Sequence, residues 1–192
     1  MQGDYEMNVP EAIENLRNAM ASEGVIPSKG VGEELFLFLS TMVPIINVDV
    51  LVVSPQREVL LSWRSDTHCG CVWHLHGGCI RFQESIESCL HRTAVTEFGS
   101  DVSIFKLMGI HEGIADKSNL KNPKERSHFI SLLYQCELKD EVMLRNLDAK
   151  EIAGHLAWLA DIPSNFLEIQ WFYFDTLRTV MKEPKRRKDY GV

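Results

Sequence analysis

Apolar and polar positions alternate along this chain with two different periods, which predict strands in some segments and helices in others. Apolar runs rich in Val, Ile and Leu predict strands at 45–53, 59–63, 104–112 and 128–138. A helical period appears in the middle of the chain, where an apolar residue recurs at every fourth position: Ile86, Leu90, Ala94 and Phe98. That spacing places one apolar stripe on a helix, with acids and an arginine on the opposite side.

The two ends of the chain differ from its middle. Residues 1–44 predict two helices, the first ended by Gly24 and the second, over 32–42, apolar enough that we expect it to be mostly buried. These helices either cover the core or form a dimer contact or a lid. A further helix is predicted over 165–181, and the charged tail, 183–192, is expected to be disordered. The sequence therefore divides into an N-terminal helical extension (1–44), a domain (45–182) and the tail.

Composition narrows the class of protein. The chain has 192 residues, 45% of them hydrophobic, which suits one globular domain, and five cysteines, an odd number that predicts free thiols. A formal net charge of −7 argues against a nucleic-acid partner. No apolar run is long enough to span a membrane, and the first residues lack the pattern of a secretory signal. A cytoplasmic protein without a membrane or nucleic-acid partner is therefore expected.

Residues 77–99, GGCIRFQESIESCLHRTAVTEFG, carry the most specific motif of the chain. The spacing of five residues in this segment reproduces the frame of the Nudix box: Gly78, Glu84, Arg92, Glu97 and Gly99. The chain therefore resembles the Nudix hydrolases, which cleave nucleoside diphosphates linked to another group. In that family the arginine pairs with the first glutamate and fixes the loop on the helix.

The box departs from its usual form at two positions, which carry Thr93 and Thr96 in place of glutamate. Positions 93, 96 and 97 lie on one patch of a helix, where three carboxylates would converge and hold several cations. Only Glu97 remains here. We expect one Mg²⁺ ion, with Mn²⁺ as a possible substitute, held by Glu97 and the carbonyl of Gly77.

Within the family, the branch that this sequence most resembles is that of the GDP-mannose mannosyl hydrolases, which also lack those two carboxylates. The resemblance covers roughly two thirds of the chain. It implies an α+β protein with the Nudix fold, an α/β/α sandwich around a mixed β-sheet, that forms a homodimer. It also implies a nucleoside diphosphate sugar as substrate, hydrolysed at the anomeric carbon to a nucleoside diphosphate and free sugar.

The resemblance also assigns roles to residues outside the box. Arg64 matches an arginine that contacts the diphosphate, and its charge would assist catalysis as the leaving group departs. Asp49 matches an aspartate near the sugar. Within the box segment, Arg81 follows the glycine pair and would reach a phosphate, although the family's arginine in this loop lies two positions earlier, where this chain has Cys79. His128 stands where the resembling enzymes have a histidine, and a purely structural histidine is the alternative.

The general base is the least defined element of the site. The resembling enzymes place a glutamine metal ligand and a histidine base where an ungapped match puts Ile152 and Ala153. Neither can take a proton. His155 lies two residues further on and is the predicted base, because a neutral imidazole suits this role near pH 7. The other candidates are a water held by Glu97 and two side chains, His76 and Glu151.

Two other functions stay open. Hydrolysis by attack on phosphorus, as in ordinary Nudix pyrophosphohydrolases, would give a nucleoside monophosphate, although the two threonines of the box count against it. A catalytically silent protein that binds a nucleotide sugar would keep the fold without the base.

Overall fold

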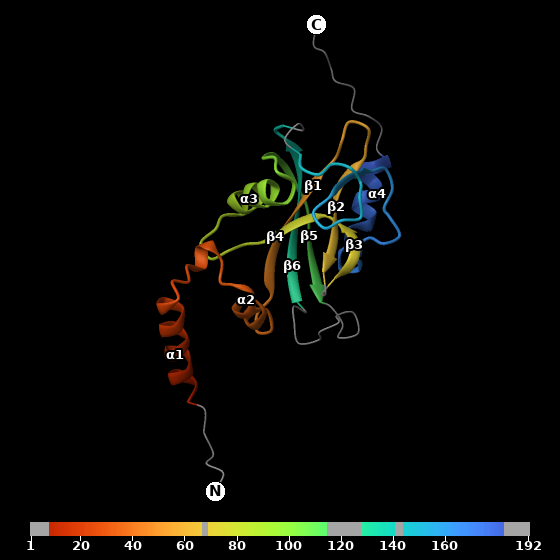
Figure 1. Cartoon of the computed structure of the whole chain (residues 1–192). Helices are drawn as coiled ribbons and strands as arrows, with labels where there is room; N and C mark the ends of the chain where they lie inside the picture. Colours follow the sequence, from red (N-terminus) through yellow and green to blue (C-terminus); the bar gives the residue numbers. More distant parts are fainter. Residues whose placement is uncertain (1–7, 67–68, 115–127, 141–143, 183–192) are drawn as a thin grey trace.

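The structure is a computed structural model that describes residues 8–66, 69–114, 128–140 and 144–182. Its strands form two sheets (Figure 1). A mixed four-stranded sheet has the order β4-β1-β6-β5, in which β1 and β6 are parallel and the other pairs antiparallel. An antiparallel three-stranded sheet has the order β3-β2-β7. The strands are β1 (Ile45–Val52), β2 (Val59–Asp66), β3 (Gly70–His74), β4 (His76–Cys79), β5 (Val102–Ile114), β6 (His128–Leu138) and β7 (Leu156–Leu159).

Helices lie on both sides of these strands, as expected of the Nudix sandwich (Figure 1). Helix α3 (Ile86–Phe98) packs on the side of β1 and β4, and α4 (Phe174–Lys182) lies on the other side, preceded by the 3₁₀ helix η4 (Glu168–Tyr173). Ser85 caps α3 by accepting a hydrogen bond from the backbone of Ser88, and Gly99 ends it at φ 83°. The α+β class and the sandwich are confirmed.

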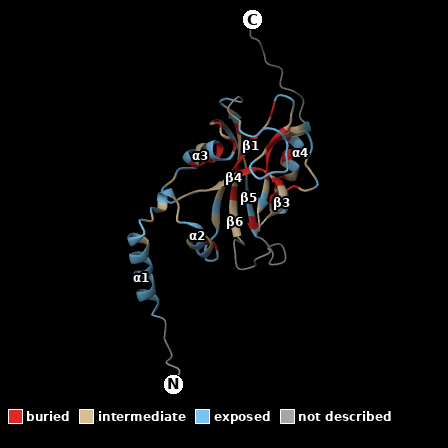
Figure 2. Cartoon of the chain, viewed as in Figure 1, coloured by how far each residue is buried: buried red, intermediate tan, exposed pale blue. Residues whose placement is uncertain are grey.

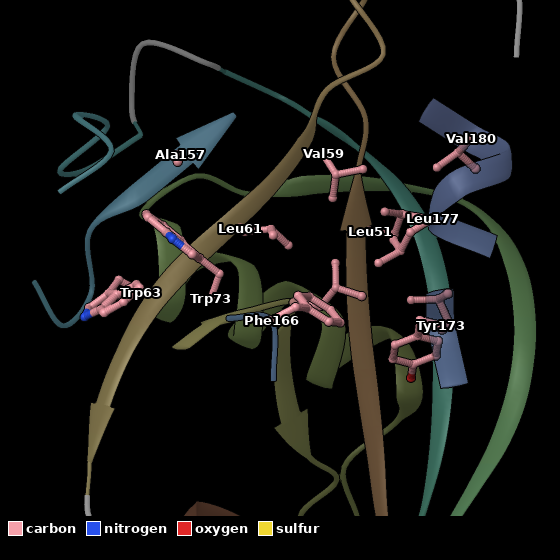
Figure 3. Packing of buried hydrophobic residues seen from close by; sticks show 12 residues of the cluster. Leu51, Val59, Leu61, Trp63, Trp73, Ala157, Phe166, Tyr173, Leu177 and Val180 are labelled. Carbon is pink, nitrogen blue, oxygen red and sulfur yellow. The ribbon is translucent and has the colours of Figure 1, made fainter. Parts of the chain in front are cut away.

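The core has two parts because β1 buries both of its faces. Leu51 points toward the three-stranded sheet, η4 and α4, where Trp63, Trp73 and Tyr173 fill the interior (Figure 3). Val48, Val50 and their neighbours on the opposite face pack against α3. This alternation puts Asp49 on the same face of β1 as Leu51, within reach of η4.

The N-terminal extension contains α1 (Val9–Ser22), the 3₁₀ helix η1 (Pro27–Lys29) and α2 (Glu33–Ser40). The expectation that the second helix is mostly buried was wrong. Ser40 is its only buried residue, and Phe38 is 52% exposed. No residue of α1 is buried, and this helix stands away from the sheets (Figures 1 and 2). An apolar stripe predicted these helices correctly but did not determine what they pack against.

Other boundaries differ modestly from the sequence-based ones. The helix predicted over 165–181 is two shorter helices, η4 and α4, and the four-residue strand β7 had no distinct pattern. The charged tail lies outside the described residues. Across the part of the chain that the structure describes, we find no helix with the length and hydrophobicity that a membrane crossing requires.

Candidate active site

A cleft of about 1270 Å³ is lined by residues from both sheets, from α3 and from η4. The predicted site residues that line it are Asp49, Arg64, Gly77, Gly78 and Glu97. They come from β1, β2, β4 and α3, so segments up to about fifty positions apart in sequence meet at one concave surface. A large cleft with a few convergent polar groups is the usual form of a small-molecule site.

Gly77 and Gly78 line the cleft where β4 runs beside β1. Asp49 lies opposite Gly77 in the strand register, and a Cβ atom on residue 77 would lie 2.3 Å from Oδ1 of Asp49. A Cβ atom on residue 78 would lie 2.4 Å from Oγ1 of Thr93 on α3. Only glycine therefore lets β4 approach a carboxylate on one face and the helix on the other.

The loop before α3 is fixed by an ion pair within the Nudix box. Nε of Arg92 lies 2.7 Å from Oε1 of Glu84, and Nη2 donates to Oε2 at 2.8 Å and to the carbonyl of Cys79 at 2.9 Å. The backbone N–H of Arg81 also donates to Glu84. The hydrogen bond from Arg92 lowers the pKa of Glu84 to about 2, although burial opposes it. The two residues thus hold the loop on the helix and do not line the cleft.

Arg64 and Glu97 form the charged part of the cleft. Nε of Arg64 donates to a carboxylate oxygen of Asp66, two residues along β2. Burial alone would lower the pKa of Arg64, but this bond and the neighbouring acidic groups, Glu97 among them, raise it. Burial raises the pKa of Glu97, and the positive charge of Arg64 acts in the opposite direction. A carboxylate and a guanidinium are thus close enough to share one electrostatic environment.

The oxygen donors of this region suit one hard cation. Glu97 and Gly77, the two expected ligands, line the same cleft, and Mg²⁺ is usually bound by one or two carboxylates together with substrate phosphates and water. Thr93 is buried and supplies no charge. In the described ranges, no group of three or more His, Cys, Asp or Glu side chains is placed to hold a metal. The donor set therefore fits a single ion better than a cluster.

Asp49 lies at the floor of the cleft and is 5% exposed. One of its carboxylate oxygens accepts a hydrogen bond from the hydroxyl of Tyr173, and Ser131 on β6 also bonds to it. Burial raises the pKa of Asp49 to about 6, although both hydrogen bonds lower it. The carboxyl group is therefore fixed in position and can change its charge near neutral pH.

His155 does not lie where its predicted role would place it. Its side chain is absent from the lining of the cleft, although the preceding Ala153 and Gly154 contribute to that lining. Its Nδ1 lies 2.6 Å from Oδ1 of Asp148, and its carbonyl accepts from the backbone of Trp63 at 2.8 Å. These bonds hold the segment before β7 against β2, so the histidine faces Asp148. Its role as general base stays a prediction.

Arg81 and His128 also lie outside the lining of the cleft. The Arg81 guanidinium lies close to the N-terminal extension, where a Cβ atom on Gly30 would be 3.9 Å from its Nε. Nε2 of His128 lies 2.9 Å from Oε1 of Glu112, a residue that does line the cleft. His128 is therefore at the rim, and contact of either residue with a substrate stays a prediction.

Among the polar residues of the cleft to which the sequence assigned no role are Ser62 and His74. They face each other across β2 and β3, and Oγ of Ser62 lies 2.9 Å from Nε2 of His74. Ser62 interrupts an apolar strand two residues before Arg64, which was a usable signal. Its partner could not be inferred, because the register of the two strands decides which residue lies opposite.

The chain belongs to the Nudix family. A family model, described as the NUDIX domain, matches residues 43–190, which is most of the chain. The matched range contains the glycine pair, the Glu84–Arg92 pair and Glu97. Members of the family are hydrolases of nucleotide-type substrates that generally use a divalent metal such as Mg²⁺.

Three similar proteins share between 16% and 26% sequence identity with this chain. The chain is 26% identical to the low-salt glycan biosynthesis protein Agl8 of Haloferax volcanii over 115 residues, which are 60% of this chain and 72% of that protein. Its fold is similar to that of a MutT Nudix hydrolase from Burkholderia pseudomallei, with a TM-score of 0.54, 18% identity, and coverage of 72% of this chain and 96% of the other. A UDP-X diphosphatase gives a TM-score of 0.52 at 16% identity, with 88% of this chain and 79% of the other covered.

Proposed function

We propose that this Nudix protein hydrolyses a nucleoside diphosphate sugar at the anomeric carbon and releases a nucleoside diphosphate and free sugar. The observation that carries the proposal is that helix α3 brings one carboxylate, that of Glu97, into the cleft, where the charge of Arg64 acts on it. Attack on phosphorus needs a strongly activated water, which Nudix enzymes obtain from several metal ions. Attack on carbon needs mainly that the charge of the leaving diphosphate be neutralised.

Each residue of the cleft has its own role in the proposed reaction. Glu97 and the carbonyl of Gly77 would hold Mg²⁺, which neutralises diphosphate charge when bound. Arg64, oriented by Asp66, would bind the diphosphate and stabilise it as it leaves. Asp49, at the floor of the cleft, would bind a hydroxyl of the sugar. An oxocarbenium-like transition state then requires only a late proton transfer from the attacking water.

The relatives support the substrate class but not its identity. Agl8 is named for glycan biosynthesis, a process that uses activated sugars, and one protein of similar fold is titled a UDP-X diphosphatase. The second title also keeps attack on phosphorus as the alternative reaction. The proposal includes a homodimer, supported by the exposed apolar stripe of α1, which has no partner in the described part of this chain.

The bond that breaks can be identified directly. We would incubate the protein with GDP-mannose and Mg²⁺ in ¹⁸O-labelled water and analyse the products by chromatography and mass spectrometry. Label in free mannose beside unlabelled GDP is the expected result. GMP with mannose 1-phosphate would replace the proposal with attack on phosphorus. Tight binding without products, repeated with other nucleoside diphosphate sugars, would replace it with a binding protein.

The metal assignment has its own test. The substitution Glu97→Gln keeps the size of the side chain and removes the charge, so we expect a loss of Mg²⁺-dependent kcat of about 100-fold or more with an unchanged fold. The matched control is Glu87→Gln, because Glu87 is an exposed glutamate of the same helix that does not line the cleft. Equal activity of the two variants would remove Glu97 from the metal site.

A further inference from the structure

The cleft contains a serine and a histidine that are hydrogen-bonded to each other, and a backbone carbonyl determines which of the two donates. Nδ1 of His74 lies 2.8 Å from the carbonyl oxygen of Leu75, while Nε2 lies 2.9 Å from Oγ of Ser62. A carbonyl oxygen can only accept, so Nδ1 carries the ring proton and Nε2 presents its lone pair. The hydroxyl of Ser62 therefore donates to His74.

The side chain of Gln170 holds the backbone of Leu75, and therefore the carbonyl that orients His74, in place. The side chain of Gln170, on η4, accepts from the backbone N–H of Leu75 at 2.9 Å and donates to its carbonyl at 3.2 Å. Leu75 is fully buried, so the carbonyl that orients His74 cannot turn toward solvent. The carbonyl of Leu75 thus holds the ring of His74 in one tautomer. In hydrolytic enzymes with a nucleophile and a base, a third group orients the base in the same way.

The pair lies beside the charged groups of the site. Ser62, His74, Arg64 and Glu97 all line the cleft, and Ser62 and Arg64 lie on the same face of β2. Ser62 is 2% exposed, so only a small part of its surface is available to a water in the cleft.

The surroundings keep His74 neutral at neutral pH. Burial lowers the pKa of His74 to about 4, and the charge of Arg64 lowers it further, while the bond to Leu75 and the charge of Asp66 act in the opposite direction. The ring of His76, whose centroid is 6.3 Å away, faces it from β4. A neutral imidazole can accept a proton throughout the pH range in which the enzyme would work.

We propose that Ser62 and His74 form a proton relay that acts as the general base of this site, with Ser62 in contact with the attacking water. The relay rests on the proposed function. As the oxygen of the water bonds to the anomeric carbon, the bond from that carbon to the diphosphate oxygen breaks and its electron pair leaves with the diphosphate. The water passes a proton to Oγ of Ser62, and Ser62 passes its own proton to Nε2 of His74, which later releases a proton to solvent.

Kinetics of four variants test the relay. Ser62→Ala removes the intermediate group, and His74→Gln keeps a polar side chain that cannot take the proton. Both should lower kcat by about 100-fold or more with KM little changed, and urea unfolding should show that both variants still fold. Ser62→Thr should restore most of kcat, and His91→Gln, on the outer face of α3, is the histidine control.

Two readouts separate failure of the relay from failure of the proposed function. Product analysis of the wild type decides the reaction, and unchanged kcat in Ser62→Ala and His74→Gln overturns the relay whichever bond is cleaved. The ring nitrogens of His74, assigned in ¹H–¹⁵N spectra by their loss in His74→Gln, should show a neutral ring with the proton on Nδ1 at pH 6. The opposite tautomer or a protonated ring would overturn the relay even without turnover.

Discussion

The Nudix-box segment (77–99) and the N-terminal extension (1–44) both carry apolar stripes at helical spacing, but only the stripe of the box segment is buried. Helix α3 buries Leu90, Ala94 and Phe98 completely and is capped at both ends. Helix α1 buries nothing, and Ile13 is 47% exposed. An apolar stripe therefore predicts a helix, but the surface that it packs against depends on contacts outside the segment.

The contrast also shows what holds the box in place. Besides its apolar face, α3 has the Glu84–Arg92 pair and the close approach of Gly78 to Thr93. In α1, an ion pair joins Nη1 of Arg17 to Oε2 of Glu14 over 3.6 Å on the exposed surface, where such a pair adds little stability. Substitutions in the two segments should accordingly differ in effect by several kcal/mol.

A large loss of stability is expected from Arg92→Ala, which removes the ion pair of the box. It leaves Glu84, whose side chain is 10% exposed, without its main partner, so we expect the free energy of unfolding to fall by about 2–4 kcal/mol at pH 7. Arg145→Ala is the control, because Arg145 gives α3 a single exposed hydrogen bond to a carbonyl. Urea unfolding of both variants measures the difference, and equal losses would show that the ion pair does not hold the box.

The same pair gives a pH dependence with a definite sign. The pKa of Glu84 is about 2 in the folded protein and 4.5 ordinarily, so the unfolded chain binds more protons between these values. The contribution of the pair is complete above pH 4.5 and is lost as the pH falls toward 2. The difference in stability between wild type and Arg92→Ala should therefore shrink in that range, and a constant difference would mean that the loss has another cause.

Next to the box lies a buried side chain that lacks hydrogen-bond partners, that of His76. It is fully buried against Phe98, and neither ring nitrogen has a hydrogen-bond partner among the described residues. Replacing a buried group that lacks partners by an apolar one of similar size removes a desolvation penalty, so His76→Leu should raise the free energy of unfolding by about 1–2 kcal/mol. In contrast, His74→Leu should lower it, because both nitrogens of His74 are bonded. Denaturant unfolding of the two variants checks the signs, and a destabilised His76→Leu would contradict the interpretation.

These cases show which parts of the fold and of the site could be predicted from the sequence. Local periods and one spaced motif predicted four of the strands (β1, β2, β5 and β6), helix α3 and the box residues. The structure brings Asp49, Arg64, Gly77 and Glu97 to one cleft. What could not be predicted depends on contacts between distant segments. The Ser62–His74 pair requires a strand register, and the position of His155 depends on its bonds to Asp148 and to β2.

The smallest effect on stability is expected in α1. The double substitution Ile13→Glu and Leu16→Glu places two charges on a stripe that is already exposed, so the free energy of unfolding of a monomer should change by less than about 0.5 kcal/mol. Leu90→Ala, on the corresponding stripe of α3, should cost about 2–5 kcal/mol. If a second copy of the chain covers the stripe of α1, as the proposed homodimer implies, sedimentation velocity should show a dimer for the wild type and a monomer for the double variant. A dimer that survives both charges would place the interface elsewhere, and α1 would then need another partner to account for its apolar residues.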